Sequence, residues 1–221
     1  MQYIGMDKVE RMRTAIDPDA YVRKTDVVYE NGHFWRRARE LVRRDRFGEV
    51  VFAVERPNGR VVTVTSREYP EGIHRVPTGG IAYGEDILSA VHREVREELG
   101  LDVTVVRFLG VIAFRIRHEA DSFPFYSFLF HLREAGGRLL EDATDDEVSG
   151  VREVDAEQLE ELSGQLLSIR PDWRDWGRFR HETTHAFVSY FKQLPSPSDA
   201  ERTCPVMDDA RPADGSHKMD A

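Results

Sequence analysis

Cysteine is nearly absent from this 221-residue sequence, which contains only Cys204. A single cysteine excludes a disulfide within the chain and suits a reducing cytoplasm. No apolar run approaches the ~20 residues that are needed to span a bilayer. The charged start of the chain also lacks the apolar core of a secretory signal. The sequence therefore predicts a cytoplasmic protein with no membrane partner.

An excess of positive charge is lacking as well, because the formal net charge is −9 at pH 7. This balance argues against bulk nucleic-acid binding through a basic surface. The hydrophobic content of 40% is enough for one packed core. We predict an N-terminal extension over residues 1–46, a domain over residues 47–194 and a disordered, proline-containing tail over residues 195–221.

The N-terminal extension contains two predicted elements and a basic run. Lys8–Ile16 is a short amphipathic helix, and Val27–Trp35 is a β-hairpin that turns at Asn31-Gly32. Two interpretations of the basic run stay open: a solvated face or homodimer contact, and an anion-recognition patch for substrate phosphate. Its members are Arg36, Arg37, Arg39, Arg43, Arg44 and Arg46.

Runs of β-branched and aromatic residues predict the strands of the domain. Glu49–Glu55 and Arg60–Thr65 are joined by Pro57-Asn58-Gly59, which predicts a hairpin. The further predicted strands are Val103–Val106, Gly110–Ile116, Phe123–Phe130 and Gly150–Val154. Asp155 is placed to cap a helix that runs to about Leu167, and a final helix is predicted over Trp173–Leu194.

A helix predicted over Asp86–Leu99 carries most of the chemistry. It contains no internal proline or glycine, and Gly100 is placed to end it. At about 100° per residue, one apolar stripe forms, and it consists of Leu88, Val91, Val95 and Leu99. Three glutamates fall together beside this stripe, and they are Glu94, Glu97 and Glu98.

These glutamates predict a metal site. Two carboxylates ~5 Å apart repel by roughly 3 kcal/mol at an effective dielectric of 20, and Glu94 and Glu98 form such a like-charged pair. A positive partner is therefore expected. Clustered oxygen ligands suit Mg²⁺, with Mn²⁺ as a substitute, because both bind through carboxylates and substrate phosphate oxygens.

The stretch from Gly79 to Leu101 resembles the Nudix box, G-x5-E-x7-R-E-U-x-E-E-x-G-U, in which U is apolar. Every specified position is met, by Gly79, Glu85, Arg93, Glu94, Val95, Glu97, Glu98, Gly100 and Leu101. The resemblance implies an α/β fold of the Nudix type, an α/β/α sandwich with a mixed sheet between helices. It also implies metal-dependent hydrolysis of a nucleoside diphosphate linked to another moiety.

The resemblance further implies roles for single residues. Glu94, Glu97 and Glu98 would bind the metal, and Arg93 would pair with Glu85 to orient them. The general base stays open between a glutamate of the helix and a carboxylate from a late loop, for which the candidates are Glu147 and Asp146.

The predicted partner is a nucleotide-type small molecule, and a nucleoside triphosphate and a nucleotide sugar both stay open as substrates. Gly79 and Gly80 allow the main chain to approach a ligand closely. Most rings of the aromatic strand are expected in the core, but Phe123 or Tyr126 could stack on a base.

Two other classes of function compete with the hydrolase. A Nudix-like domain could bind a nucleotide as a sensor without turnover, although such a module does not need three metal carboxylates. Alternatively, His181-Glu182-Thr183-Thr184-His185 matches HExxH, a helical zinc motif. No third zinc ligand follows at a usual spacing, so we expect that helix to be an ordinary amphipathic one.

Overall fold

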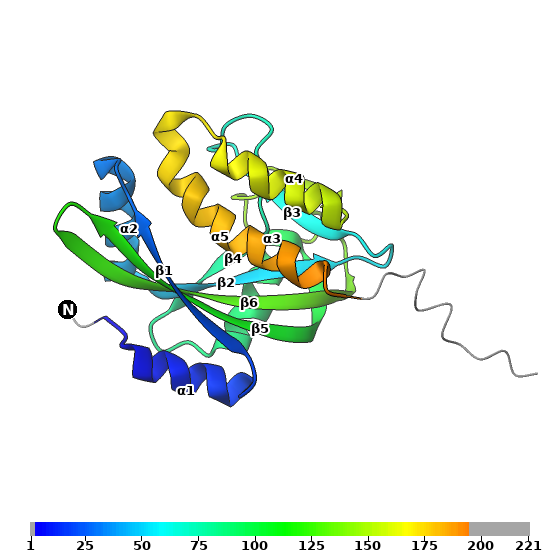
Figure 1. Cartoon of the computed structure of the whole chain (residues 1–221). Coiled ribbons are helices and arrows are strands. Elements are labelled where there is room, and N and C mark those ends of the chain that lie inside the picture. Colours follow the sequence, from blue (N-terminus) through cyan, green and yellow to red (C-terminus); the bar gives the residue numbers. More distant parts are fainter. Residues whose placement is uncertain (1–2, 195–221) are drawn as a thin grey trace, which may run out of the picture.

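The computed structural model describes residues 3–194, and one sheet of seven strands lies at its centre (Figure 1). The strands are β1 (Tyr21–Val28), β2 (Arg46–Glu55), β3 (Val61–Thr65), β4 (Thr78–Ala82), β5 (Leu101–His118), β6 (Asp121–Gly137) and β7 (Gly150–Val154). Their order is β1-β5-β6-β2-β3-β7, and β4 pairs with β2. β1 is parallel to β5 and β6 is parallel to β2, whereas the other pairs are antiparallel. The sheet is therefore mixed, as predicted.

Helices cover both faces of this sheet. They are α1 (Met6–Ile16), α2 (Gly32–Arg44), α3 (Ile87–Leu99), α4 (Ala156–Leu167) and α5 (Arg174–Phe191), with a short 3-10 helix, η1 (Pro171–Trp173), before α5. One buried cluster joins α1 and α3 to the sheet, and a second joins α2, α4 and α5 to it. Figure 1 shows α1 on one side of the sheet and α4 and α5 on the other. The predicted α/β/α sandwich is confirmed.

The predicted hairpin is present, but two other predicted strands form a single one. β2 and β3 form the predicted hairpin, in which the Arg56 amide donates to the Arg60 carbonyl at 2.8 Å. The two strands predicted over 103–106 and 110–116 are instead one strand, β5, whose pairing with β6 shifts register at three places. Such irregularities interrupt the alternation of side chains without ending the strand, which explains why the pattern suggested two elements.

The predicted hairpin near residue 31 is wrong. Residues 21–28 form β1, which pairs in parallel with β5, and the chain then enters α2. The Asn31 side chain accepts from the His33 amide at 2.9 Å and caps the helix. Asparagine before glycine suits a helix start as well as a tight turn, and the apolar side chains Trp35 and Val42 are spaced for a helix that buries one face.

The last two helices form where they were predicted. The Asp155 side chain accepts from the Gln158 amide at 2.9 Å, and the two residues form a capping box for α4. In α5, Phe179 and Phe187 are buried against the sheet. The predicted tail, residues 195–221, lies outside the described residues. No helix within residues 3–194 has the length and apolar character that crossing a membrane requires.

Candidate active site

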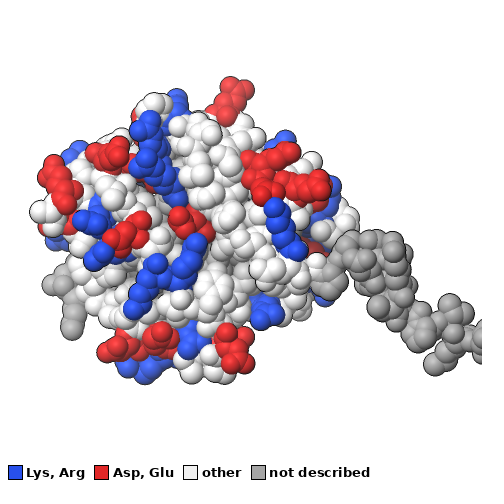
Figure 2. Space-filling view, in the orientation of Figure 1, with Lys and Arg blue, Asp and Glu red and all other residues white. Residues whose placement is uncertain are grey.

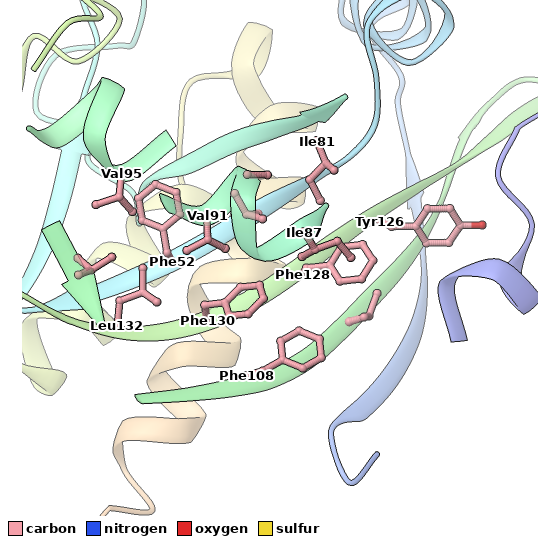
Figure 3. Packing of buried hydrophobic residues seen from close by; sticks show 14 of the residues in the cluster. Phe52, Ile81, Ile87, Val91, Val95, Phe108, Tyr126, Phe128, Phe130 and Leu132 are labelled. Carbon is pink, nitrogen blue, oxygen red and sulfur yellow. The ribbon is translucent and has the colours of Figure 1, made fainter. Parts of the chain in front are cut away.

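The glutamate helix is α3, and it ends at Gly100 as predicted, whereas Asp86, predicted as its first residue, is the cap before Ile87. The Asp86 side chain accepts from the Ser89 amide at 2.9 Å at the start of the helix. At the end, Gly100 adopts a left-handed conformation with φ of 70°, which glycine tolerates without strain. One member of the predicted stripe is wrong, because Leu88 is 37% exposed and Ile87 is buried in its place. Figure 3 shows Ile87, Val91 and Val95 among the core side chains.

Arg93 connects the helix to the loop before it. Its Nε donates to Glu85 Oε1 at 2.8 Å, so the predicted ion pair between these residues is present. Its Nη1 donates to Glu94 Oε1 at 2.8 Å and to Glu97 Oε2 at 2.9 Å, and its Nη2 donates to the Gly80 carbonyl at 3.0 Å. The hydrogen bond from Arg93 lowers the pKa of Glu85 and keeps that carboxylate charged. One guanidinium therefore fixes three glutamates and a main-chain oxygen.

Glu94 lies against residues 79–84, here called the glycine loop, of which Gly79 and Gly80 belong to β4. A Cβ atom on Gly79 would lie only 2.0 Å from the Glu94 Cγ, so this approach requires a residue without a side chain. Burial raises the pKa of Glu94, although its hydrogen bond with Arg93 opposes the shift. The loop and the helix are thus in direct contact at the first of the predicted metal ligands.

Glu98 is the most buried of the three glutamates, with 4% of its surface exposed. Its Oε2 atom is buried and has no hydrogen-bond partner within residues 3–194. The pKa of Glu98 is raised to about 8, mainly by burial, which Arg75 opposes, and to a lesser extent by the neighbouring charges of Glu94, Glu147 and Asp145. Negative charge at Glu98 is therefore poorly compensated by the protein alone.

The late acidic loop lies beside α3. The amides of Thr144 and Asp145 donate to the Glu97 carbonyl at 3.0 and 2.9 Å. A surface depression of about 700 Å³ lies between the helix and the loop, and its lining comprises Glu97, Ala143, Thr144, Asp145 and Asp146. The fold therefore brings the predicted acidic segment, including Glu147, to the glutamate helix.

The donor set of this site fits a divalent cation. Glu94, Glu97 and Glu98 offer carboxylate oxygens from one helix, and the buried Oε2 of Glu98 has no hydrogen-bond partner within residues 3–194. Within residues 3–194, however, no three acidic, histidine or cysteine side chains already stand in a metal-binding group. Arg93 holds Glu94 and Glu97 instead.

The aromatic side chains predicted to stack on a base do not reach this site. Tyr126 is 3% exposed and Phe123 is 1% exposed, so both rings are covered by protein. The Tyr126 hydroxyl donates to the Ile4 carbonyl at 2.8 Å, and Figure 3 shows its ring turned toward the N-terminal segment. Phe123 and Tyr126 belong to the two different buried clusters. Both rings are buried because helices cover both faces of the sheet at this central strand.

The basic run is divided between α2 and the site. Several of its arginines pair with acids, including Arg37 with Glu68 at 3.0 Å. On the face drawn in Figure 2, positive and negative side chains are interspersed. Arg46 differs, because a Cβ atom on Gly80 would lie 2.5 Å from its Cζ, and its charge acts on Glu94. Sequence reasoning placed Arg46 in the run but not at the loop.

The HExxH residues form a contact between helices. His181 Nδ1 lies 2.9 Å from the Ser163 carbonyl and 3.0 Å from its hydroxyl, in α4. The rings of His181 and His185 stack with centroids 5.2 Å apart. In this arrangement His181 faces α4, which is what an amphipathic packing helix predicts.

The fold and the site define an α/β sandwich in which a glycine loop and a carboxylate-rich helix form one site. A family model described as NUDIX domain matches residues 45–177. The chain therefore belongs to the Nudix family.

Several known proteins are similar to parts of the chain. Nudix hydrolase 10 of Arabidopsis thaliana is 45% identical over 49 residues, which are 22% of this chain and 17% of that protein. An ADP-ribose pyrophosphatase structure from Streptococcus suis is 14% identical with a TM-score of 0.42, covering 67% of this chain and 93% of that one. The E. coli dihydroneopterin triphosphate pyrophosphohydrolase is 16% identical with a TM-score of 0.43, covering 66% and 97%.

Proposed function

We propose that the chain is a metal-dependent hydrolase that cleaves a phosphoanhydride bond in a nucleoside diphosphate linked to another moiety. The observation that carries this proposal is the carboxylate set of α3. Glu98 is buried with an unpartnered oxygen, and its negative charge adds to that of Glu94. Oxygen donors with uncompensated charge are what a divalent cation needs for binding.

Each residue of the site has a proposed role. Glu94, Glu97 and Glu98 hold Mg²⁺, or Mn²⁺ in its place, and such an ion neutralises phosphate charge and acidifies water. Arg93 and Glu85 orient the carboxylates through the contacts between loop and helix. Gly79 and Gly80 allow the main chain to approach the diphosphate.

The proton of the attacking water has two candidate acceptors. One is a glutamate of α3, and the other is Glu147 or Asp146 of the loop before β7. As the base takes the proton, the water oxygen bonds to one phosphorus atom. The bond from that phosphorus to the bridging oxygen breaks, and the other phosphate leaves with the bridging oxygen.

The substrate class and the setting complete the proposal. A nucleoside triphosphate or a nucleotide sugar is the proposed substrate, and the single cysteine supports a reducing cytoplasm. A homodimer through residues 1–46 is also proposed. Chromatographic mass measurement of the full chain, compared with a variant changed on the exposed face of α2, tests that contact.

The first experiment is a release assay for phosphate and pyrophosphate. The panel contains nucleoside triphosphates, nucleotide sugars, dinucleoside polyphosphates and ADP-ribose, each with Mg²⁺, with Mn²⁺ and with chelator. We expect turnover of one class that chelator abolishes. Nucleotide binding without turnover of any compound would instead favour a sensor module.

Two variants assign that activity to the site. Glu97→Gln removes charge and keeps shape, so turnover should fall strongly, whereas His185→Ala on α5 should leave it unchanged. Loss of turnover in His185→Ala together with tightly bound zinc would overturn the proposed metal site.

A further inference from the structure

Arg75 is a buried arginine just ahead of the glycine loop. It precedes β4, and its main chain pairs with Val64 of β3, from amide to carbonyl at 3.0 Å and from carbonyl to amide at 2.8 Å. Its exposed fraction is 7%. The strand-like pairing fixes the direction of this side chain, four residues before Gly79.

The hydrogen-bond partners of Arg75 are neutral. Its Nε donates to the Tyr69 hydroxyl at 2.8 Å, and its Nη1 donates to the Val76 carbonyl at 2.9 Å. Within residues 3–194, the guanidinium forms no ion pair, and its Nη2 has no hydrogen-bond partner. Burying a charge without an opposite charge is costly, so arginines this deeply buried are usually paired.

Arg180 of α5, whose side chain is 14% exposed, shows how this fold pairs another partly buried arginine with an acid, although its Nε has no hydrogen-bond partner within residues 3–194. Its Nη1 donates to both carboxylate oxygens of Glu49, at 2.9 and 2.8 Å. The Glu49 carboxylate also accepts from the Ser127 hydroxyl at 2.8 Å. The charge of Arg180 is therefore matched inside the protein, whereas that of Arg75 is not.

Glu98 of the glutamate site is one of the charges that act on Arg75. Burial lowers the pKa of its guanidinium, but Tyr69, Glu98 and Glu49 together raise that pKa above its ordinary value, so the group stays charged. Glu98 and Arg75 influence each other without forming an ion pair. A cation on Glu98 and an anion on Arg75 would satisfy both buried charges at once.

We propose that Arg75 binds a phosphate oxygen of the substrate through its Nη2 and sets specificity for a ligand with a second anionic group beyond the metal-bound phosphate. Tyr69 is a positioning residue, since its hydroxyl holds the guanidinium. This inference rests on the proposed hydrolase function, because it requires a phosphate-bearing ligand at α3.

The surroundings of Tyr69 provide a spectroscopic readout. Its ring lies 4.7 Å from the ring of Trp176, which lies 5.3 Å from that of Trp173. The Arg75 Cζ lies 5.5 Å from the centroid of the Tyr69 ring. An anion bound at Arg75 changes the field at these indoles, so tryptophan emission should change on binding. Trp35, the remaining tryptophan, is replaced by Phe in the reporter background to isolate this signal.

The test is an equilibrium titration with methylenediphosphonate, a diphosphate analogue that hydrolysis does not cleave, in the presence of Mg²⁺. Arg75→Met should weaken binding by roughly 10- to 100-fold, which is the loss of one hydrogen bond to a charged group. Arg75→Lys should recover part of that affinity. Arg117→Met is the control. Arg117 is an exposed arginine near the end of β5 that pairs with Asp26 of β1, and this variant should bind the analogue as the parent does.

Kinetics test the positioning role of Tyr69. Tyr69→Phe removes the hydroxyl and keeps the ring, so KM should rise while kcat is retained. A merely structural role would alter the thermal midpoint without this split between KM and kcat. An unchanged KM in a folded Tyr69→Phe protein would overturn the positioning role.

Mn²⁺ binding, followed by electron paramagnetic resonance, separates the two proposals. If the parent shows metal-dependent turnover and Arg75→Met binds the analogue with parental affinity, the Arg75 inference is wrong and the hydrolase stands. If Glu98→Gln retains both Mn²⁺ affinity and turnover, the hydrolase site is wrong. If the Arg75→Met chain does not fold, Arg75→Gln takes its place, and parental affinity for the analogue in Arg75→Gln overturns the inference.

Discussion

Glu49 and Glu98 lie in different regions of the molecule and are equally buried, with 4% of each residue exposed. Glu49, on the side of the sheet covered by α5, accepts from Arg180 and from Ser127. Glu98, on α3, has a buried oxygen without a partner within residues 3–194. The carboxylate of Glu49 is therefore fully hydrogen-bonded, whereas that of Glu98 is not.

We interpret this difference as one of role: Glu49 contributes to stability, and Glu98 contributes to ligand binding. A buried ion pair with complete hydrogen bonding is a structural solution, and its loss harms stability. A buried carboxylate without a partner costs stability as it stands, and clusters of this kind mark functional sites. Replacing each glutamate by glutamine removes the charge, keeps the shape of the side chain and so tests the distinction.

The largest expected effect is on turnover in Glu98→Gln. Losing a metal ligand removes several kcal/mol of transition-state stabilisation, so hydrolysis should fall by roughly 1000-fold. The free energy of unfolding without metal should stay the same or rise, since the substitution removes a carboxyl group that is buried without a hydrogen-bond partner. Steady-state kinetics and urea unfolding measure the two quantities. A strongly destabilised Glu98→Gln protein would make Glu98 structural, like Glu49.

Glu49→Gln should show the opposite pattern. Removing one partner of a buried pair leaves the Arg180 charge uncompensated, and about 3 kcal/mol of stability should be lost. Turnover per folded molecule should fall far less than in Glu98→Gln. Urea unfolding measures the loss of stability, and kinetics at low temperature measure turnover. A loss of turnover equal to that of Glu98→Gln would show that Glu49 and Glu98 do not differ in role.

Gly79→Ala tests the glutamate region without changing a charge. The added methyl group would collide with Glu94, so stability should fall by about 1–3 kcal/mol and turnover by roughly 100-fold as the carboxylate moves. Gly164→Ala in α4 is the matched control, because its Cβ would meet nothing within 4 Å. That change should stabilise the helix by about 0.5–1 kcal/mol and leave turnover intact.

The smallest expected effect concerns His131, which is buried in β6 with Nε2 2.9 Å from Glu55 Oε2. Burial lowers its pKa from 6.5, although Glu55 opposes the shift. As pH falls below 6.5, His131 becomes protonated in the unfolded chain. In the folded protein its pKa is lower, so it is protonated only at a lower pH. Stability should therefore decrease across that window, by at most ~1.4 kcal/mol per pH unit.

Urea unfolding of the parent and of His131→Gln at pH 7.5 and 5.5 measures the contribution of His131 to the change in stability with pH. The variant should lose less stability between the two pH values than the parent does. His92→Gln, at an exposed position of α3, should lose as much as the parent. Equal losses in all three proteins would contradict the lowered pKa.

Local sequence signals predicted α3, its end at Gly100 and the β2–β3 hairpin, because each depends on residues close in the chain. The pairing of β1 with β5 was not predictable in this way, since it joins segments about ninety residues apart. The same limit applies at the site. The glycine loop and glutamates are contiguous, whereas the burial of Arg75 depends on how the segment before β4 packs against β3.

The parallel pairing of β1 with β5 has a practical consequence for any shortened version of the chain. Eight residues of β1 cover β5 from Gly110 to Arg117. A version that began at residue 45, where the family match begins, would leave that stretch of backbone open to pair with another molecule. β1 itself carries Arg23, Lys24 and Asp26, charges of the kind that discourage edge-to-edge aggregation. We therefore expect β1 to limit aggregation by covering the edge of β5.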